Sequence, residues 1–273
     1  MAARLRFWLM ENLWRCSINE RDFDRIITRA QKYKYSSMSY VGFDEIRNAE
    51  ILRDCDELIL LCDSSKEPAM LYFAANDFNA VVKLIADMPG KLRIHFVPKE
   101  YAIALSNIGF IEWGEFLDFW NTDLAKTAAQ CECEGEIEYL RSDECDEASN
   151  LTKKCELQSR GFEGVQIMAV SEWLADGKVI VCRKDAAIAG LCSVSIYNEG
   201  TTLWIRVIAV DPAYQGHGIG KELMTQAIQY GIQNGAVKGF LAADVLNLNA
   251  IGLFNKFGFF AKDSAGELQM VRE

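Results

Sequence analysis

The sequence predicts a mixed α/β protein made of two related domains, and three observations lead to this prediction. Short apolar runs typical of strands alternate with stretches of helical character along most of the chain. Half of the 273 residues are hydrophobic, which is enough for two cores of ordinary size. A stretch of the first half also aligns with a stretch of the second half. We therefore expect a mixed sheet covered by helices on both sides, present in two copies.

Composition excludes several classes of partner. The net charge is −10 and there is no long basic run, which argues against nucleic acid and against an anionic membrane. No apolar stretch is long enough to span a membrane, and charged residues interrupt the first sixteen positions, unlike a secretory signal. We therefore expect a cytoplasmic protein with neither nucleic acid nor a membrane as a main partner, and a monomer or homodimer.

The cysteines point to reduced thiols rather than to disulfides or a metal. There are nine, an odd number, spread through both halves. Cys131 and Cys133, with Cys145 and Cys155 further on, fit no familiar zinc-ligand spacing. We expect no metal site, and interpret these residues as small buried side chains and exposed thiols of a linker.

The linker itself is predicted at residues 121–135, which are small, polar and acidic without clear periodicity. It divides the chain into domains at 1–125 and 136–273. In the second domain the apolar runs and turn residues predict an ordered series of elements. Strands are expected at 137–140, 178–183, 187–197, 202–210 and 239–246, helices at 143–159, 171–175, about 219–233 and 250–257, and a final hairpin at 259–271.

The first half repeats part of this series. Residues 92–110 align without a gap with residues 241–259, and both read as strand, turn, short helix and Gly-Phe. Upstream, residues 70–75 parallel residues 204–209, but a predicted helix at 77–86 follows almost at once. Chance is the alternative, because helices often end in Gly-Phe. If the repeat is a true duplication, the first domain is a degenerate copy that lacks the glycine-rich loop described next.

That loop is the most informative motif of the chain. Residues 215–220, Gln-Gly-His-Gly-Ile-Gly, follow the predicted strand 202–210 and the turn Asp211-Pro212, and they open a helix. The first N–H groups of a helix have no partners within it, and glycines let a ligand approach the backbone, so the arrangement favours a phosphate. The glycine spacing is not that of a dinucleotide fold, and Lys221-Glu222 is not the end of a P-loop.

Two segments resemble a known family. Residues 210–224 resemble the acyl-CoA pyrophosphate loop of the GNAT superfamily of N-acyltransferases, in which Arg or Gln, two residues, Gly, one residue and Gly or Ala recur; Gln215, Gly218 and Gly220 match. Residues 247–259 resemble the family's Asn-x-x-Ala-x-x-Leu-Tyr-x-x-x-Gly-Phe segment. The resemblance covers about half of the chain and implies the GNAT fold, acetyl-CoA as cofactor, and a tandem protein with one degenerate half.

The resemblance also implies a set of cofactor-binding residues. The pantetheine arm would pair with the strand backbone, the pyrophosphate would lie on the loop, and Asn247 would help to seat the cofactor, although Asn at a strand end is also a common turn residue. The implied residues are Ile208, Ala209, Val210, Gln215, Gly216, His217, Gly218, Ile219, Gly220, Lys221, Asn247 and Phe254.

The catalytic residues remain unassigned. Transfer to an amine needs a proton acceptor and a proton for the leaving thiolate, yet Phe254 stands where the family usually has Tyr, and Trp204 and Arg206 occupy strand positions that often carry a Glu base. Asp244 and Cys192 are weak candidates, and a water chain is an alternative. Other polar residues with weaker claims are Tyr197, Glu199 and His95.

Arg206 is the one candidate for binding the acceptor. It would pair with a substrate carboxylate or phosphate if it faces the groove, or form a surface ion pair if it does not. We therefore expect an N-acetyltransferase that moves an acetyl group from acetyl-CoA to a primary amine, of a small molecule or a protein. The alternative is an acyl-CoA-binding pseudoenzyme that acts as a sensor or scaffold. The acceptor is expected to be selected by the region around 159–175.

Overall fold

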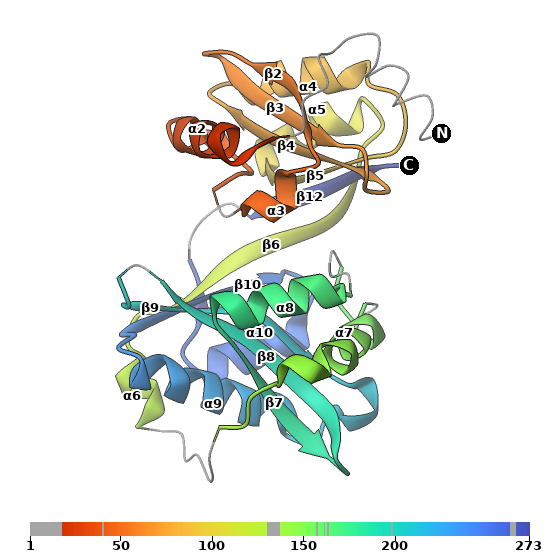
Figure 1. Ribbon diagram of the computed structural model, residues 1–273. Helices are drawn as coiled ribbons and strands as arrows, with labels where there is room; N and C mark the ends of the chain where they lie inside the picture. Colours follow the sequence, from red (N-terminus) through yellow and green to blue (C-terminus); the bar gives the residue numbers. More distant parts are fainter. Residues whose placement is uncertain are drawn as a thin grey trace. The chain divides into compact units, whose positions relative to one another are not determined.

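The protein is described here by a computed structural model that covers residues 18–39, 41–129, 137–156, 158–160, 162, 164–197, 199–262 and 266–273. The chain forms two compact units, Met1–Glu115 together with Ala265–Glu273, and Phe116–Ser264. Figure 1 labels the elements of both. Each unit is a mixed sheet with helices on its two faces, as the sequence predicts.

In the described residues, the main strands of the first unit have the order β2-β3-β4-β5-β12. Strands β4 and β5 pair in parallel, and the other neighbours in this order pair antiparallel. Strand β3 is buried along its whole length, as is typical of a central strand with both faces covered. The strands are β2 (Glu50–Asp54), β3 (Leu58–Asp63), β4 (Ala69–Ala75), β5 (Leu92–Pro98) and β12 (Glu267–Arg272), and a two-residue strand, β1 (Tyr35–Ser36), pairs with β4.

Helices cover both faces of this sheet. Alternate residues of β4 point to opposite faces, so Leu71 and Phe73 join one core while Tyr72 and Ala74 join the other. Helix α4 begins where the Asp77 carboxylate accepts the N–H of Asn79 at 3.0 Å. The helices are α2 (Glu20–Ala30), α3 (Phe43–Ile46), α4 (Phe78–Ala86), the 3₁₀ turn η1 (Lys99–Tyr101) and α5 (Ala102–Ser106).

The second unit has the strand order β6-β10-β9-β8-β7. Strands β9 and β10 pair in parallel, and the other neighbours in this order pair antiparallel. The strands are β6 (Ile111–Asn121), of which the part from Phe116 onward lies in this unit, β7 (Lys178–Lys184), β8 (Ala187–Tyr197), β9 (Thr202–Val210) and β10 (Lys238–Asp244), with the short β11 (Phe260–Ala261) beside β6.

Two cores lie on the two faces of the second sheet. One contains Leu223 and Ala227 of α9 with Phe254 of α10; the other contains Leu151 of α7 and Trp173 of α8. Figure 1 shows α9 and α10 on one face and α7 and α8 on the other. The helices are α6 (Leu124–Ala128), the turn η2 (Ser142–Glu144), α7 (Cys145–Lys154), α8 (Ile167–Asp176), the turn η3 (Pro212–Tyr214), α9 (Ile219–Gln233) and α10 (Leu248–Lys256).

The structure differs from the sequence-based predictions at the ends of both domains. The expected hairpin 259–271 is wrong, because β11 pairs with β6 while β12 pairs with β5 of the first unit. The units therefore divide at Glu115 and take the last nine residues into the first unit, unlike the expected boundaries at 125 and 136. The linker prediction is wrong at 124–128, where Asp123 caps α6 by accepting the N–H of Lys126 at 3.0 Å. Residues 130–135 of that linker lie outside the described residues.

Both units share one irregularity in their parallel strands. Strands β4 and β5 pair only over Ala69–Leu71 and Leu92–Ile94, and β9 and β10 pair only over Thr202–Trp204 and Lys238–Phe240. Beyond these three residue pairs the two strands of each pair separate. A parallel pair joined over only three residue pairs is thus a feature of both units, which agrees with a duplication.

In the described part of the chain, no helix combines the length and the apolar character needed to cross a bilayer.

Candidate functional site

The glycine-rich loop is held in place by polar contacts at the end of β9. The carboxylate of Asp211 accepts the N–H of Ala213 at 2.9 Å and pairs with the Lys154 ammonium at 2.7 Å. These bonds lower the pKa of Asp211 against the opposing effect of burial. Next along the chain, the Gln215 amide donates to the Val210 carbonyl at 3.1 Å and to Gln158 Oε1 at 3.2 Å. The side chain of Gln215 thus fixes the loop to the strand.

Gly216 and Gly218 form an open cradle in front of α9. Both have positive φ, 80° and 85°, which side chains disfavour, and a Cβ on either would meet nothing within 4 Å. Gly218 is the N-cap of α9 and offers no side-chain acceptor. The N–H groups of the first turn of α9 therefore lie at an uncapped helix start with open space before it, where an anion is favoured.

The remaining loop residues have different surroundings. His217 is exposed and its Nδ1 lies 3.0 Å from the Gln215 carbonyl, and the side chain of Lys221 is exposed. Ile219 is 2% exposed and belongs to the core. A Cβ on Gly220 would lie 3.2 Å from Leu253 Cδ2, so this glycine lets α9 and α10 pack closely. Only part of the motif therefore faces outward.

The separation of β9 from β10 gives the site its second part. Strand β9 pairs with β8 as far as Val210, but with β10 only as far as Trp204. The stretch containing Ile208, Ala209 and Val210 thus has an edge that β10 does not use. This edge leads directly to the loop, so an extended chain that pairs with β9 would reach the open cradle at its end.

In the first unit the corresponding edge is occupied by the chain itself. Strand β1 pairs with β4 at Tyr35–Ala75 and Ser36–Ala74, beyond the end of the β4–β5 pairing. The pairing continues at Ser37, whose N–H donates to the Phe73 carbonyl at 2.9 Å and whose hydroxyl accepts the Phe73 N–H at 2.9 Å.

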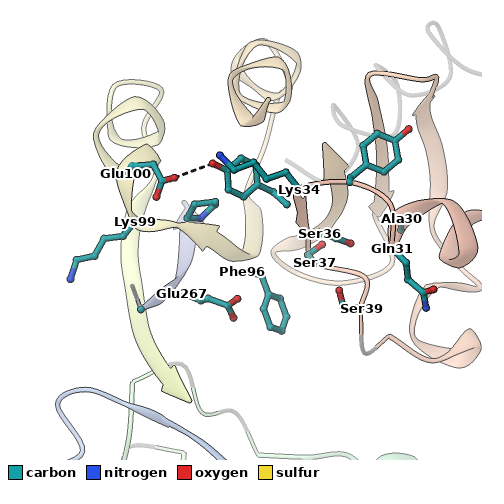
Figure 2. A pocket seen from close by; sticks show the side chains of 14 residues that line it. Ala30, Gln31, Lys34, Ser36, Ser37, Ser39, Phe96, Lys99, Glu100 and Glu267 are labelled. Atoms are coloured by element: carbon teal, nitrogen blue, oxygen red, sulfur yellow. Dashed lines mark hydrogen bonds between the residues drawn. The ribbon is translucent and has the colours of Figure 1, made fainter. Parts of the chain in front are cut away.

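A cavity of about 480 Å³ adjoins this segment in the first unit. Figure 2 shows Ser36 and Ser37 on one side of it and Phe96, Lys99 and Glu100 on the other. The cavity therefore lies beside the inserted segment, and the cofactor-binding residues implied by the sequence all lie in the other unit.

Neither predicted catalytic candidate presents an accessible base. Asp244 is 2% exposed and accepts two hydrogen bonds from the Arg160 guanidinium, at 2.9 and 3.1 Å, and one from the Leu246 N–H at 3.1 Å. Cys192 is completely buried on β8, and burial raises the pKa of its thiol. The Cys192 thiol is a core side chain, because the strand face on which it lies is covered by α9.

Phe254 and Asn247 also make contacts that stabilise the fold. Phe254 is 3% exposed, and its ring centroid lies 6.2 Å from that of Phe119 in the core. Asn247 is the N-cap of α10, where its Oδ1 accepts the N–H of Ala250 at 3.2 Å. Asn247 therefore has a local structural role at the end of the turn before α10, as the alternative interpretation expects.

The other polar candidates are accounted for by local contacts. The Arg206 guanidinium lies 4.3 Å from the centroid of the Trp204 ring and 3.8 Å from an Asp176 oxygen, which is the ion pair given as an alternative. The rings of Tyr197 and Trp204 are 6.3 Å apart. Glu199 is exposed in the turn before β9.

His95 and the cysteines also have defined environments. Burial, then Arg93 and Lys66, lower the pKa of His95 to about 4, so this ring of the first unit is neutral near pH 7. Cys145 and Cys155 are buried free thiols, while Cys131 and Cys133 lie outside the described residues. Among the residues that the structure describes, no group of three potential ligands could hold a metal ion.

Two polar residues at the site were missed by the sequence reasoning. Arg160 lies in the region 159–175 that was expected to select the acceptor, but its partner Asp244 is 84 positions away. Asp118 lies on β6, opposite Ala242 of β10, although its position in the chain assigns it to the first domain. Only the tertiary structure reveals either relationship.

The comparisons with known proteins agree with this geometry. Residues 137–259 match the family model of the acetyltransferase (GNAT) family. An N-alpha-acetyltransferase MAK3 of Arabidopsis thaliana is 30% identical over 69 residues, which cover 25% of this chain and 36% of that protein. The matched region therefore spans about a third of the length of that curated relative.

Solved structures show the same fold over more of the chain. A tandem GNAT protein of the clavulanic acid biosynthesis pathway has a TM-score of 0.58 at 12% identity, over 99% of this chain and 95% of that one. A GCN5-related N-acetyltransferase from Sphaerobacter thermophilus has a TM-score of 0.54 at 12% identity, over 80% of both chains. The fold is thus that of tandem GNAT proteins, and residues 137–259 of this chain are similar to the acetyltransferase (GNAT) family, whose model they match.

Proposed function

We propose that the second unit is an N-acyltransferase that moves an acetyl group from acetyl-CoA to a primary amine. The preferred acceptor in this proposal is the amine of a small molecule. The observation that carries this proposal is the open cradle at Gly216 and Gly218 in front of the uncapped start of α9. An anionic pyrophosphate fits it, because the N–H groups and the helix dipole both favour negative charge and no side chain obstructs the approach.

Each part of the site has a role in this proposal. Backbone groups from Gln215 to Lys221 would bind the pyrophosphate, with the exposed Lys221 ammonium as a nearby charge. The edge of β9 at Ile208–Val210 would bind the pantetheine arm by main-chain hydrogen bonds. Acetyl-CoA supplies the activated thioester, so the protein has only to orient the amine and manage its proton.

A second candidate function is an acyl-CoA-binding pseudoenzyme that acts as a sensor or scaffold. One observation favours it: Phe254 has no hydroxyl and is buried, and the buried Asp244 is already paired with Arg160. This alternative shares the cofactor site with the first and differs in lacking transfer.

One pair of measurements tests both proposals. Thermal unfolding is followed with increasing acetyl-CoA, and release of free CoA thiol is followed with a panel of small primary amines and amino-terminal peptides. Stabilisation together with amine-dependent thiol release is expected for the transferase. Stabilisation without thiol release for any amine supports the pseudoenzyme, and no stabilisation contradicts both. Acetyl-CoA at about 100 times its dissociation constant should raise the free energy of unfolding by about 2.7 kcal/mol.

A further inference from the structure

The strand that enters from the first half of the sequence brings a carboxylate to one face of the second sheet. Asp118 of β6 lies directly opposite Ala242 of β10, in an antiparallel register without a bulge. Phe119 and Leu241 point into the core covered by α9 and α10, so Asp118 and Ala242 point to the other face. The contact between the rings of Trp120 and Phe240, 4.9 Å apart, confirms that these alternate positions share that face.

This face is the one from which an acceptor can approach. The gap between β9 and β10 opens beyond Phe240, next to Ala242. On the α9 side, the gap is bordered by buried side chains such as Leu241 and Ala243. On the opposite side Ala242 is small and exposed, which leaves room above β10 for an amine.

The charges on this face single out Asp118. Asp244 is paired with Arg160, and Asp176 is paired with Arg206. The carboxylate of Asp118, in contrast, makes no hydrogen bond or ion pair with any other residue in the described parts of the chain. Asp118 is therefore a half-buried carboxylate whose oxygens are available to a ligand.

We infer that Asp118 is the proton acceptor for the acceptor amine of the second unit. This inference rests on the proposed transferase function and assigns a residue to its missing base. Neighbouring strands are about 4.8 Å apart, so an amine above Ala242 is within reach of the Asp118 carboxylate directly or through one water.

The electrostatic surroundings fit this role. Partial burial raises the pKa of Asp118, and the Lys262 ammonium opposes this shift. The Lys262 ammonium lies 5.5 Å from the centroid of the Trp120 ring, which is two residues from Asp118 on the same strand. A nearby cation disfavours a second, so Lys262 promotes loss of the proton from a bound alkylammonium.

The reaction then balances without another reactant. The alkylammonium gives one proton to Asp118, and its nitrogen forms a bond to the thioester carbonyl carbon. The carbon–sulfur bond breaks, and its electron pair leaves with sulfur as the thiolate. The nitrogen then loses its second proton, which neutralises the thiolate through solvent, and Asp118 returns its proton to water.

The test compares Asp118→Asn with the wild type and with Asp143→Asn, a control at an exposed carboxylate. The probes are ethanolamine, putrescine and phenethylamine, which are mostly protonated near neutral pH, and hydroxylamine, which is mostly not. For an alkylamine that the wild type acetylates, kcat/KM of Asp118→Asn should fall about a hundredfold or more. The rate with hydroxylamine should fall far less, and thermal stabilisation by acetyl-CoA should not change.

A second readout is independent of turnover. Because the folded-state pKa of Asp118 is raised, its charge destabilises the fold once the pH exceeds that pKa. Asp118→Asn should therefore be more stable than the wild type near neutral pH and lose this advantage in acid. An equal loss of activity with both classes of amine, an undiminished alkylamine rate, or reduced neutral-pH stability overturns the inference while leaving the transferase function standing. A wild type that binds acetyl-CoA but acetylates none of the probes overturns both.

Discussion

The guanidinium of Arg160 donates two hydrogen bonds to the carboxylate of Asp244, from Nε at 3.1 Å and from a terminal nitrogen at 2.9 Å. The Asp244 side chain is 1% exposed and that of Arg160 is 35% exposed. The pair fixes the segment after α7 to the end of β10. A carboxylate held in this way is an anchor for that segment rather than a proton acceptor.

Removing the two partners of this pair should therefore have unequal effects. Arg160→Ala leaves a buried charge without its partner and should lower the free energy of unfolding by about 3–5 kcal/mol. Asp244→Asn leaves the more exposed Arg160 cation without its charged partner, so it should lower the free energy of unfolding by less. Urea unfolding of both single variants and the double variant measures this, and the double variant should recover part of the loss. Equal effects, fully additive in the double variant, would contradict the pairing as the source of stability.

Gly218 offers a direct test of the cofactor loop. A glutamate there would place a side chain and a negative charge before α9, where the pyrophosphate is proposed to lie, so Gly218→Glu should abolish thermal stabilisation by acetyl-CoA. Gly200→Glu is a matched control, since Gly200 also has positive φ, 83°, with nothing within 4 Å of its Cβ position. Undiminished stabilisation of Gly218→Glu by acetyl-CoA would exclude the site.

The first unit should not bind the cofactor. Its equivalent strand edge is already paired with Tyr35–Ser37, and its chain passes from β4 to α4 with only two residues between them. Isothermal titration should give one CoA per chain. A stoichiometry of two would mean that the inserted segment leaves β4 and that the first unit is not degenerate in binding.

The replacement Phe254→Tyr distinguishes a vacant proton-donor position from a core position. Because the ring is 3% exposed beside Phe119, an added hydroxyl without a partner should lower the free energy of unfolding by about 1–3 kcal/mol. Acetyl-CoA affinity should hardly change. Higher turnover at unchanged stability would instead show that the ring borders the thioester and that the hydroxyl has a place there.

The bonds to Asp211 make a pH-dependent contribution to stability. Its pKa is lowered in the folded state, so this stability is present above the unfolded-state pKa, about 3.9, and is lost as the pH falls through the folded-state value. Asp211→Asn should be less stable than the wild type near neutral pH, and the difference should shrink in acid. Urea unfolding at several pH values measures it, and a difference that does not vary with pH would contradict the linkage.

The sequence predicted those features that depend on local patterns. Alternating strands and helices, the loop 215–220 and the repeat of 92–110 in 241–259 all rest on residues close together in the chain, and the fold contains them. The glycines of the loop were informative because positive φ at Gly216 and Gly218 requires them. Local chemistry of this kind can be recognised without knowing the tertiary structure.

Long-range pairing could not be predicted in the same way. The separation of β9 from β10, the bond between Arg160 and Asp244, and the position of Asp118 opposite Ala242 depend on which strands and loops meet. The terminal strand was mistaken for half of a hairpin, because apolar alternation indicates a strand but not its partner.

The pairing of β12 with β5 has a consequence for biosynthesis. Synthesis proceeds from the N-terminus, and domains generally fold in that order. Here the sheet of Met1–Glu115 lacks β12, the strand that pairs with β5, until the segment Ala265–Glu273 has left the ribosome. The continuous segment Phe116–Ser264 is complete earlier, so the half translated first is the half that finishes folding last. Until then β5 has an unpaired edge open to other chains, so correct folding of the first unit depends on a strand that is made after the whole second unit.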